Sequence, residues 1–293
     1  MQSIRLALPG ILFLFWAPSL AAGQNIDATK LQQVLGRPGQ KIGAVIKFGF
    51  PRTDLQVRVG GVVIRPGLAL GSWAAFSGTD DNATVMGDLV LLEDEVNPVM
   101  KQLRSSGFQI TALHNHLLHE TPRLLYMHYM GRGQAEHLAA SLKKALSASK
   151  TPLGPPGPVA QPASEPPFVR IVEGVLGRTG SFSGAVLAFG IPRRDTITLQ
   201  GTTIPPAMGV AEAINVQQAG PDRVAATGDF VLTADEVNPV ISALQQHHIL
   251  VTALHGHMLD EQPRLFFLHF WAVGRARSVA AGIKAALENV AIQ

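Results

Sequence analysis

Two stretches of this chain carry histidine, glutamate and arginine residues at matching spacing. They read TALHNHLLHETPRLLYMHYMG over residues 111–131 and TALHGHMLDEQPRLFFLHFWAVG over residues 252–274. The shared histidines are His114, His116 and His128 in the first stretch and His255, His257 and His269 in the second. The other shared polar residues are Glu120 and Glu261, and Arg123 and Arg264, each arginine following a proline. His119 is not shared, because Asp260 takes its place in the second stretch.

The spacing of the histidines predicts a metal site on a β-hairpin. Side chains alternate along a strand, so His114 and His116 share one face. A turn over 118–121 returns His128 on the neighbouring strand beside Ala112, on that same face. Three converging imidazoles can hold Zn²⁺ with an open fourth position, which activates a water for hydrolysis or hydration. We therefore expect Zn²⁺ or another divalent metal in each copy, bound by the six shared histidines.

Four glutamates are candidate catalytic bases for such a site. Glu120 and Glu261 lie at the rim of the histidine face. Glu95 and Glu236 occur in a repeated DEVNPV segment, residues 94–99 and 235–240, just before the strand that carries the histidines. We interpret Asn97 and Asn238 in this segment as helix N-caps followed by a proline at the first helical position.

The same residues fit other kinds of site. In a metal-free site one histidine acts as base while Arg123 or Arg264 holds an anion. In a non-catalytic module the arginine and histidines bind an anionic ligand or a cell-envelope component. In a structural network the histidine, glutamate and arginine residues only lock the hairpin. Whether the chain is an enzyme stays open at this point.

Two further repeated dipeptides are interpreted as local structure. Gly87-Asp88 and Gly228-Asp229 are typical of a bulge or turn, with a functional aspartate as the lesser interpretation. Pro51-Arg52 and Pro192-Arg193 are typical of turns, with anion binding as the lesser interpretation.

The composition excludes several classes of protein. The 293 residues include no cysteine, which rules out disulfides, thiolate nucleophiles and Cys-ligated zinc. The net charge is only +3, and no Lys/Arg cluster follows a helix face, so we expect no nucleic-acid partner. Any partner is expected to be a small molecule or an envelope component.

The N-terminus is typical of an export signal. Arg5 precedes an apolar run over residues 6–18, and Ser19-Leu20-Ala21 is a small-x-small cleavage site. The run is short for a membrane-spanning helix. We predict a signal peptide over residues 1–23, an exported protein that is periplasmic or extracellular, and no stable membrane span after cleavage.

The first half of the chain repeats at an offset of about 141 residues, which predicts two tandem homologous domains. The predicted domains are 24–146 and 168–293, separated by a linker over 147–167 that contains seven prolines. In the first domain the expected helices are 27–36, 97–106 and 134–147, and the expected strands are 42–49, 55–64, 68–76, 84–92, 108–116 and 123–130. This order favours an α+β fold, in which each domain has a largely antiparallel sheet with helices packed on one face.

The motifs together resemble those of the LppY/LpqO family. They are PRTDLQV (51–57), Gly87-Asp88, EVNPV (95–99) and TALHNHLLHETPRLLYMH (111–128). The resemblance extends over both repeats and implies two tandem copies of an exported bacterial domain without an assigned function. Relatives in that family look like lipoproteins, whereas this chain has no cysteine to carry a lipid. The resemblance therefore implies export but not lipid anchoring.

Overall fold

A computed structural model describes residues 26–155, 157 and 162–293. The predicted signal peptide and part of the predicted linker lie outside these residues. Within the described part of the chain, no helix has the length and apolar character needed to cross a membrane.

The first domain is a six-stranded antiparallel sheet with strand order β1-β2-β5-β6-β9-β7. Strands β3, β4 and β8 form a separate small sheet beside it. The helices are α1 (Ala28–Leu35), α2 (Pro66–Ala69), α3 (Glu93–Ser105) and α4 (Ala135–Leu146). The strands are β1 (Gln40–Ile42), β2 (Val45–Pro51), β3 (Arg58–Val59), β4 (Val62–Val63), β5 (Gly71–Gly78), β6 (Ala83–Leu92), β7 (Gln109–His114), β8 (Glu120–Thr121) and β9 (Leu124–Gly133).

The second domain repeats this arrangement, with strand order β10-β11-β14-β15-β18-β16. Its helices are α5 (Pro167–Leu176), the 3₁₀ helix η1 (Pro206–Met208), α6 (Ala234–Gln246) and α7 (Ala276–Leu287). Its strands are β10 (Ser181–Ser183), β11 (Val186–Pro192), β12 (Thr198–Leu199), β13 (Thr202–Thr203), β14 (Ala211–Gly220), β15 (Arg223–Leu232), β16 (Leu250–His255), β17 (Glu261–Gln262) and β18 (Phe266–Arg275). The predicted α+β class and tandem organisation are confirmed.

Helix α1 follows its sequence signals, whereas α3 begins earlier than expected. Asp27 caps α1 by accepting from the Thr29 N–H, and Gly36 ends it in the left-handed conformation. Asn97 lies inside α3, so the N-cap interpretation was wrong. The helix starts at Glu93 because the Glu95 carboxylate accepts a hydrogen bond from the Leu92 N–H at 2.9 Å. Glu236 accepts from the Thr233 N–H in the same way, so Asn238 is not a cap either.

The predicted strand over 55–64 is instead a small hairpin, β3 and β4. Its turn is Gly60-Gly61, and Gly60 has a positive φ of 57° that glycine adopts without strain. The next predicted strand begins late because Pro66 starts the short helix α2, and β5 begins at Gly71.

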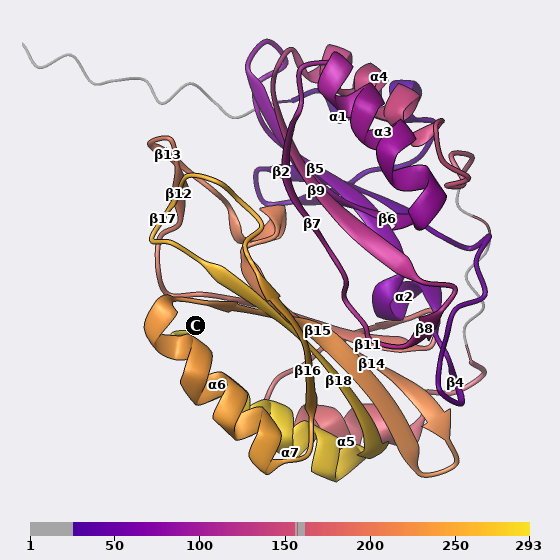
Figure 1. Ribbon diagram of the computed structural model, residues 1–293, viewed down its shortest axis with the longest axis vertical. Coiled ribbons are helices and arrows are strands. Elements are labelled where there is room, and N and C mark those ends of the chain that lie inside the picture. The colour runs from indigo at the N-terminus through magenta and orange to yellow at the C-terminus, as the bar shows by residue number, and fades with distance from the viewer. Residues whose placement is uncertain (1–25, 156, 158–161) are drawn as a thin grey trace, which may run out of the picture.

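The two sheets face each other and the larger helices cover their outer faces, as Figure 1 shows. One hydrophobic cluster lies between each sheet and its own helices. Two further clusters contain residues of both domains. One includes Met86, Met130 and Phe267, and the other includes Tyr126 and Trp271. The molecule therefore has four layers, helix–sheet–sheet–helix, with a buried interface between the sheets.

Side-chain hydrogen bonds also join the two domains. The Asn115 Nδ2 donates to the Thr252 carbonyl at 3.0 Å, and the Thr252 hydroxyl donates to the His116 carbonyl at 2.5 Å. Gln217 bonds to two backbone groups of the first domain, accepting from the Arg65 N–H and donating to the Val63 carbonyl. These bonds fix the two histidine hairpins relative to each other.

The repeated Gly-Asp dipeptides lie in the central strands β6 and β15, so the bulge or turn interpretation was wrong. A Cβ at Gly228 would lie 1.8 Å from the Ala213 carbonyl oxygen, and one at Gly87 would lie 2.3 Å from that of Trp73. Only glycine allows this close approach to the neighbouring strand. The following aspartate is thereby placed beside the interface between the sheets.

Replacing Gly228 with alanine is expected to destabilise the second domain by at least about 1–3 kcal/mol, because backbone must shift to admit the methyl group. The Gly190→Ala variant is the matched control, since nothing lies within 4 Å of a Cβ at Gly190 in the same sheet. Chemical denaturation of both variants measures the difference. Equal stability of the two variants would contradict this account of the glycine.

Candidate metal centre

The expected pairing of His128 with Ala112 is confirmed, but β7 ends at His114, so His116 lies in the following loop and not on the strand. The predicted turn over 118–121 is also wrong in part, because Glu120–Thr121 form the short strand β8. Ala112 on β7 pairs with His128 on β9, after a register shift between Ile110 and Ala112. On its other side His128 pairs with Asp88 of β6. The second domain has the same pairings, Ala253 with His269 and His269 with Asp229. In both domains the histidine face is the one that faces the opposite sheet.

The two histidine faces meet in one cluster between the domains. Ring centroids lie 3.6 Å apart for His114 and His255, 3.8 Å apart for His116 and His269, and 3.6 Å apart for His128 and His257. His114 and His255 occupy equivalent positions in the two domains. Exchanging the two domains turns the His116–His269 pair into the His257–His128 pair. The cluster is thus arranged around an approximate two-fold axis. The six histidines of the two repeats therefore lie in one cluster and not in two separate places.

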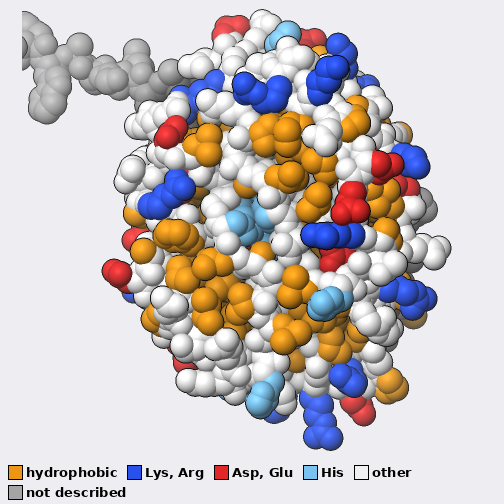
Figure 2. Space-filling view, in the orientation of Figure 1, with side chains coloured by type: hydrophobic (Ala, Val, Ile, Leu, Met, Phe, Trp, Pro, Cys, Tyr) orange, Lys and Arg blue, Asp and Glu red, His pale blue; other side chains and the backbone are white. Residues whose placement is uncertain are grey.

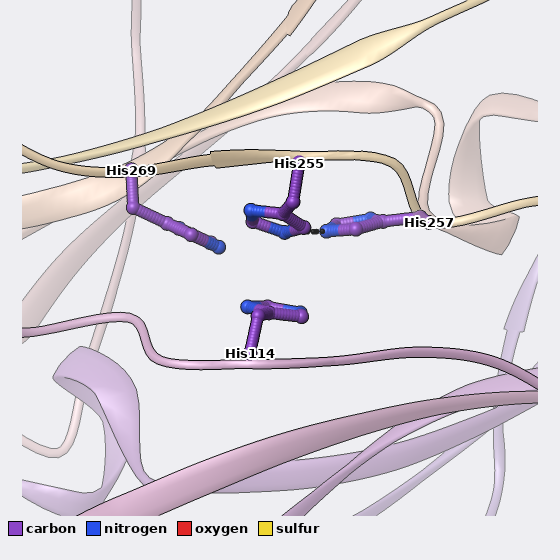
Figure 3. A group of neighbouring side chains, drawn as sticks. All are labelled: His114, His255, His257 and His269. Atoms are coloured by element: carbon purple, nitrogen blue, oxygen red, sulfur yellow. Dashed lines mark hydrogen bonds between the residues drawn. The ribbon is translucent and has the colours of Figure 1, made fainter.

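Two groups of histidines have ligand atoms close enough together to hold a metal ion. Three histidines of the second domain, together with His114 from the first, form one group within 4.8 Å (Figure 3). His114, His116 and His128 form the other, so His114 belongs to both. Nitrogen ligands at about 2.0–2.1 Å from one ion lie at most about 4.2 Å apart. Small side-chain rotations would therefore complete a four-histidine site.

The ring nitrogens at the centre are buried and mostly without partners. The His257 Nε2 lies 2.9 Å from the His255 Nε2. Five other imidazole nitrogens are buried and make no hydrogen bond; they belong to His114, His116, His128, His255 and His269. Buried polar atoms without partners are rare in proteins and call for a ligand or an ion. Imidazole nitrogen is a ligand for Zn²⁺, Cu²⁺ and Ni²⁺, so these residues fit a transition metal.

Burial keeps five of these imidazoles neutral, those of His114, His116, His128, His255 and His257. It lowers the pKa of His114 to about 4 and of His255 to about 2, and neighbouring imidazoles add to both effects. Burial is also the main cause that holds the pKa of His116, His128 and His257 well below the usual value. A neutral imidazole has a free lone pair for a metal, and it brings no positive charge to an anion.

Two aspartates lie directly behind the histidines and were missed as site residues. The Asp88 carboxylate is 3.6 Å from the His116 Nε2 and 3.8 Å from the His128 Nε2. The His269 Nδ1 bonds to the Gly228 carbonyl at 3.1 Å and also lies 2.9 Å from the Asp229 carboxylate. Burial and the neighbouring Asp229 raise the pKa of Asp88 well above its usual range. Carboxylates in such places orient metal-binding imidazoles.

A signal for these aspartates was present in the sequence. Both copies place the Gly-Asp dipeptide at the same offset within a long apolar segment. A polar residue repeated inside a buried strand suggests a site and not a turn.

The glutamates of the hairpin tips bond to their own hairpins. The Glu120 carboxylate accepts from the Leu124 N–H at 3.3 Å, and the Glu261 carboxylate accepts from the Leu265 N–H at 3.0 Å. Both glutamates are buried, in the short strands β8 and β17. These contacts support a role in holding the turn, and catalysis by either residue stays a prediction.

The two arginines that follow the prolines lie at the surface. Arg123 is 67% exposed and forms a 3.8 Å ion pair with Glu93. Arg264 is 52% exposed and pairs with Glu261 at 3.3 Å. Neither belongs to the two histidine groups. Anion binding by these arginines stays a prediction.

Glu95 and Glu236 pair with buried arginines in both domains. Arg52 is fully buried and bonds to Glu95 at 2.6 Å and to Asp54 at 2.9 Å. Arg193 makes the same pairs with Glu236 and Asp195. The dipeptides interpreted as turn residues thus include the buried centre of an ion-pair network.

This network makes Glu95 and Glu236 poor candidates for a base. Burial raises the pKa of Glu95, but bonds from Arg52 and from the N–H groups of Leu92 and Lys150 outweigh it, so the net pKa is lowered. The pKa of Glu236 is lowered by the same kind of contacts. Both oxygens of each carboxylate are engaged in these bonds.

The centre reaches the surface along the edge strands β7 and β16. Figure 2 shows histidine atoms at the surface between the two domains, with hydrophobic side chains above and below them. Leu113 and Leu254, at equivalent positions in these strands, are 43% and 47% exposed. On the inner side a small cavity of about 10 Å³ borders His128 and His257, room for about one water.

Acid should destabilise the metal-free protein through its histidines. A histidine whose folded pKa is lowered binds its proton more readily when unfolded, so its contribution to stability falls as pH drops below about 6.5. For His114 the loss continues to about pH 4. The buried carboxyl groups of Asp88 and of Glu212 on β14 have the opposite effect on stability. Burial raises their pKa, so they favour the folded state more as the pH falls. The test is therefore a difference between wild type and the His114→Gln variant.

We expect the melting temperature of wild type to fall relative to that of His114→Gln as pH drops from 7.5 to 5, both with chelator. His137→Gln is the control, because His137 is exposed on α4 and its variant should follow wild type. A constant difference between wild type and His114→Gln over this pH range would contradict the buried, neutral state of His114.

The fold and the site together define a tandem α+β protein with a histidine cluster between its domains. The family described as Domain of Unknown Function (DUF1259) matches residues 29–148 and 170–289. The chain belongs to this family and contains two copies of its domain. No curated protein and no solved structure matches the chain.

Proposed function

We propose that this protein binds one divalent transition-metal ion at the histidine cluster between its domains. The observation that carries the proposal is the convergence of His114 with His255, His257 and His269 from the other domain. The buried ring nitrogens without partners support it. Because His114 belongs to both histidine groups and offers one ligand atom, we expect one tightly bound ion per chain and not one per domain.

The chemistry of the donors selects the class of metal. The ligands are imidazoles, which suit Zn²⁺, Cu²⁺ and Ni²⁺. Mg²⁺ and Ca²⁺ require oxygen ligands, whereas neither of the two groups that could hold a metal ion contains a carboxylate. Zn²⁺ is the ion that we propose first.

The competing function, a module that binds an anion through the arginines and histidines, has weaker support. Five of the six imidazoles are held neutral by burial, so they do not supply positive charge. Arg123 and Arg264 are already paired with glutamates at the surface.

Hydrolysis is the reaction class that we propose for this centre. A divalent ion held by only three of the clustered histidines would keep an open fourth position and supply a polarised water there. The small cavity beside His128 and His257 has room for one water, and Asp88 lies within 4 Å of His128 to orient its ring. The substrate would approach from the face where the histidines reach the surface. Hydrolysis of p-nitrophenyl acetate by the zinc-loaded protein tests this class, and a rate equal to that of His114→Ala would overturn it.

Metal analysis of the full chain tests the binding proposal directly. The protein is purified without a polyhistidine tag, and its metal content is measured by mass spectrometry. Calorimetric titration with Zn²⁺ then measures stoichiometry, with Mg²⁺ as the control ion. About one equivalent of zinc and no binding of Mg²⁺ is the expected result. Less than about a tenth of an equivalent after mild purification, with no thermal shift on adding zinc, would overturn the proposal.

Membership of the LppY/LpqO family and export of the protein are also proposals. The motifs of residues 51–57 and 111–128 support membership of the LppY/LpqO family of exported proteins. Export is supported by the N-terminal residues 1–23, and the partner is then a small molecule or an envelope component. Mass spectrometry of the secreted chain tests this, with a mature N-terminus near residue 24 as the expected result.

A further inference from the structure

A cavity of about 370 Å³ opens on the second domain and shares no lining residue with the histidine cluster. It lies where the start of α5, the β14–β15 turn and the start of α7 meet. Its lining combines apolar side chains with three arginines, and the residues that matter most are Phe168, Ile171, Pro221, Arg223, Arg275 and Arg277. A cavity of this size falls within the usual range for small-molecule sites.

The first domain closes the equivalent place with an ion pair. The Asp80 carboxylate accepts from the Asp27 N–H at 2.8 Å and pairs with Lys30 at 3.3 Å. The Asp80 carbonyl also accepts from the Ala135 N–H at 2.8 Å. Asp80 thus ties the start of α1 to the start of α4. In the second domain Pro221 stands at the position of Asp80, and Ile171 at that of Lys30, so this tie is lost.

The net charge at these positions also has the opposite sign in the two domains. The three arginines of the second domain correspond to Asn82, Gln134 and Glu136 in the first. With Asp27, Lys30 and Asp80 included, the first-domain positions carry one positive and three negative charges, whereas the second-domain positions carry three positive charges. Asp222, which also lines the cavity, matches Asp81 and is common to both copies.

We propose that this cavity binds a small organic anion that carries an apolar group. The three arginines are exposed, and the structure shows no ion pair for them among the described residues. Guanidinium groups bind carboxylate, sulfonate or phosphate oxygens through paired hydrogen bonds. Phe168 and Ile171 supply the apolar wall for the remainder of the ligand. The site is separate from the metal centre and does not depend on it.

Titration with 8-anilinonaphthalene-1-sulfonate tests the proposal, because this probe joins a sulfonate to an aromatic group. The full chain should show saturable fluorescence from one site. The variant Arg223→Asn/Arg275→Gln/Arg277→Glu gives these positions the residues of the first domain and should bind at least 10-fold more weakly. Thermal unfolding checks that the variant is folded. Inorganic phosphate alone should not displace the probe, because it has no apolar group.

A second variant separates the apolar wall from the charge. Ile171→Lys/Pro221→Asp gives the second domain the Lys–Asp pair of the first and should also lose the probe. The reverse control, Lys30→Ile/Asp80→Pro, leaves the second domain intact and should bind like wild type. Unchanged affinity in both second-domain variants would overturn the proposal. So would loss of the probe on His114→Ala alone, since that would place the probe at the histidine cluster.

Discussion

Replacing His114 with alanine should lower the affinity for zinc by at least about 100-fold. His114 belongs to both histidine groups, so its loss leaves neither complete. Even residues that only orient metal ligands cost about 10–100-fold when removed, and a ligand itself should cost more. Calorimetric titration of the full chain with Zn²⁺ measures the change.

His119 provides the matched control for this experiment. It lies in the loop between β7 and β8, five residues after His114, and belongs to neither histidine group. His119→Asn is the suitable variant, because the φ of +60° at this position is tolerated by asparagine. This variant should bind zinc like wild type. If His114→Ala also bound zinc like wild type, the centre would not be the one described above.

The second large effect is expected for the buried ion-pair network, not for the metal centre. Replacing Arg52 with alanine should destabilise the first domain by about 3–5 kcal/mol. The reason is that Glu95, with a side chain only 5% exposed, would be left charged and without its main partner. The Val90 carbonyl would lose its bond from the guanidinium as well. Thermal and chemical unfolding measure the loss.

The control is Arg123→Ala, which removes an exposed ion pair of 3.8 Å and should change stability by less than about 1 kcal/mol. Zinc binding by the folded fraction of Arg52→Ala should be unchanged, since Arg52 contacts none of the histidines in the described structure. Loss of zinc affinity without loss of stability would instead point to a role for Glu95 at the metal centre.

Local patterns allowed much of the fold to be predicted. The alternation of a strand and the length of a turn are properties of neighbouring residues, and they correctly placed His128 beside Ala112. Asp27 and Gly36 marked the ends of α1 because capping acts within one helical turn. The start of α3 was misplaced because a glutamate at its third position outweighed the Asn-Pro signal.

The residues that were misjudged are those whose partners lie far away in the chain. Arg52 was interpreted as a turn residue, yet its guanidinium bonds to Glu95, 43 residues further on. Asp88 was interpreted as part of a turn, and only strand pairing places it beside His128. A local pattern can place such a residue in a buried strand, but it cannot identify the partner that the side chain meets.

The amino-acid sequence by itself determined the six histidines, the duplication of the domain, and the shared face of His114 and His128 on the first hairpin, with its counterpart on the second. It could not determine what that face meets, because strand parity selects a side of the sheet and says nothing about the opposite layer. The tertiary structure decided this by packing the two sheets against each other, which places Met86 and Phe267 in one hydrophobic cluster and Tyr126 and Trp271 in another. That packing brings the ring centroids of His114 and His255 to 3.6 Å from each other, so the histidines of both domains form one cluster.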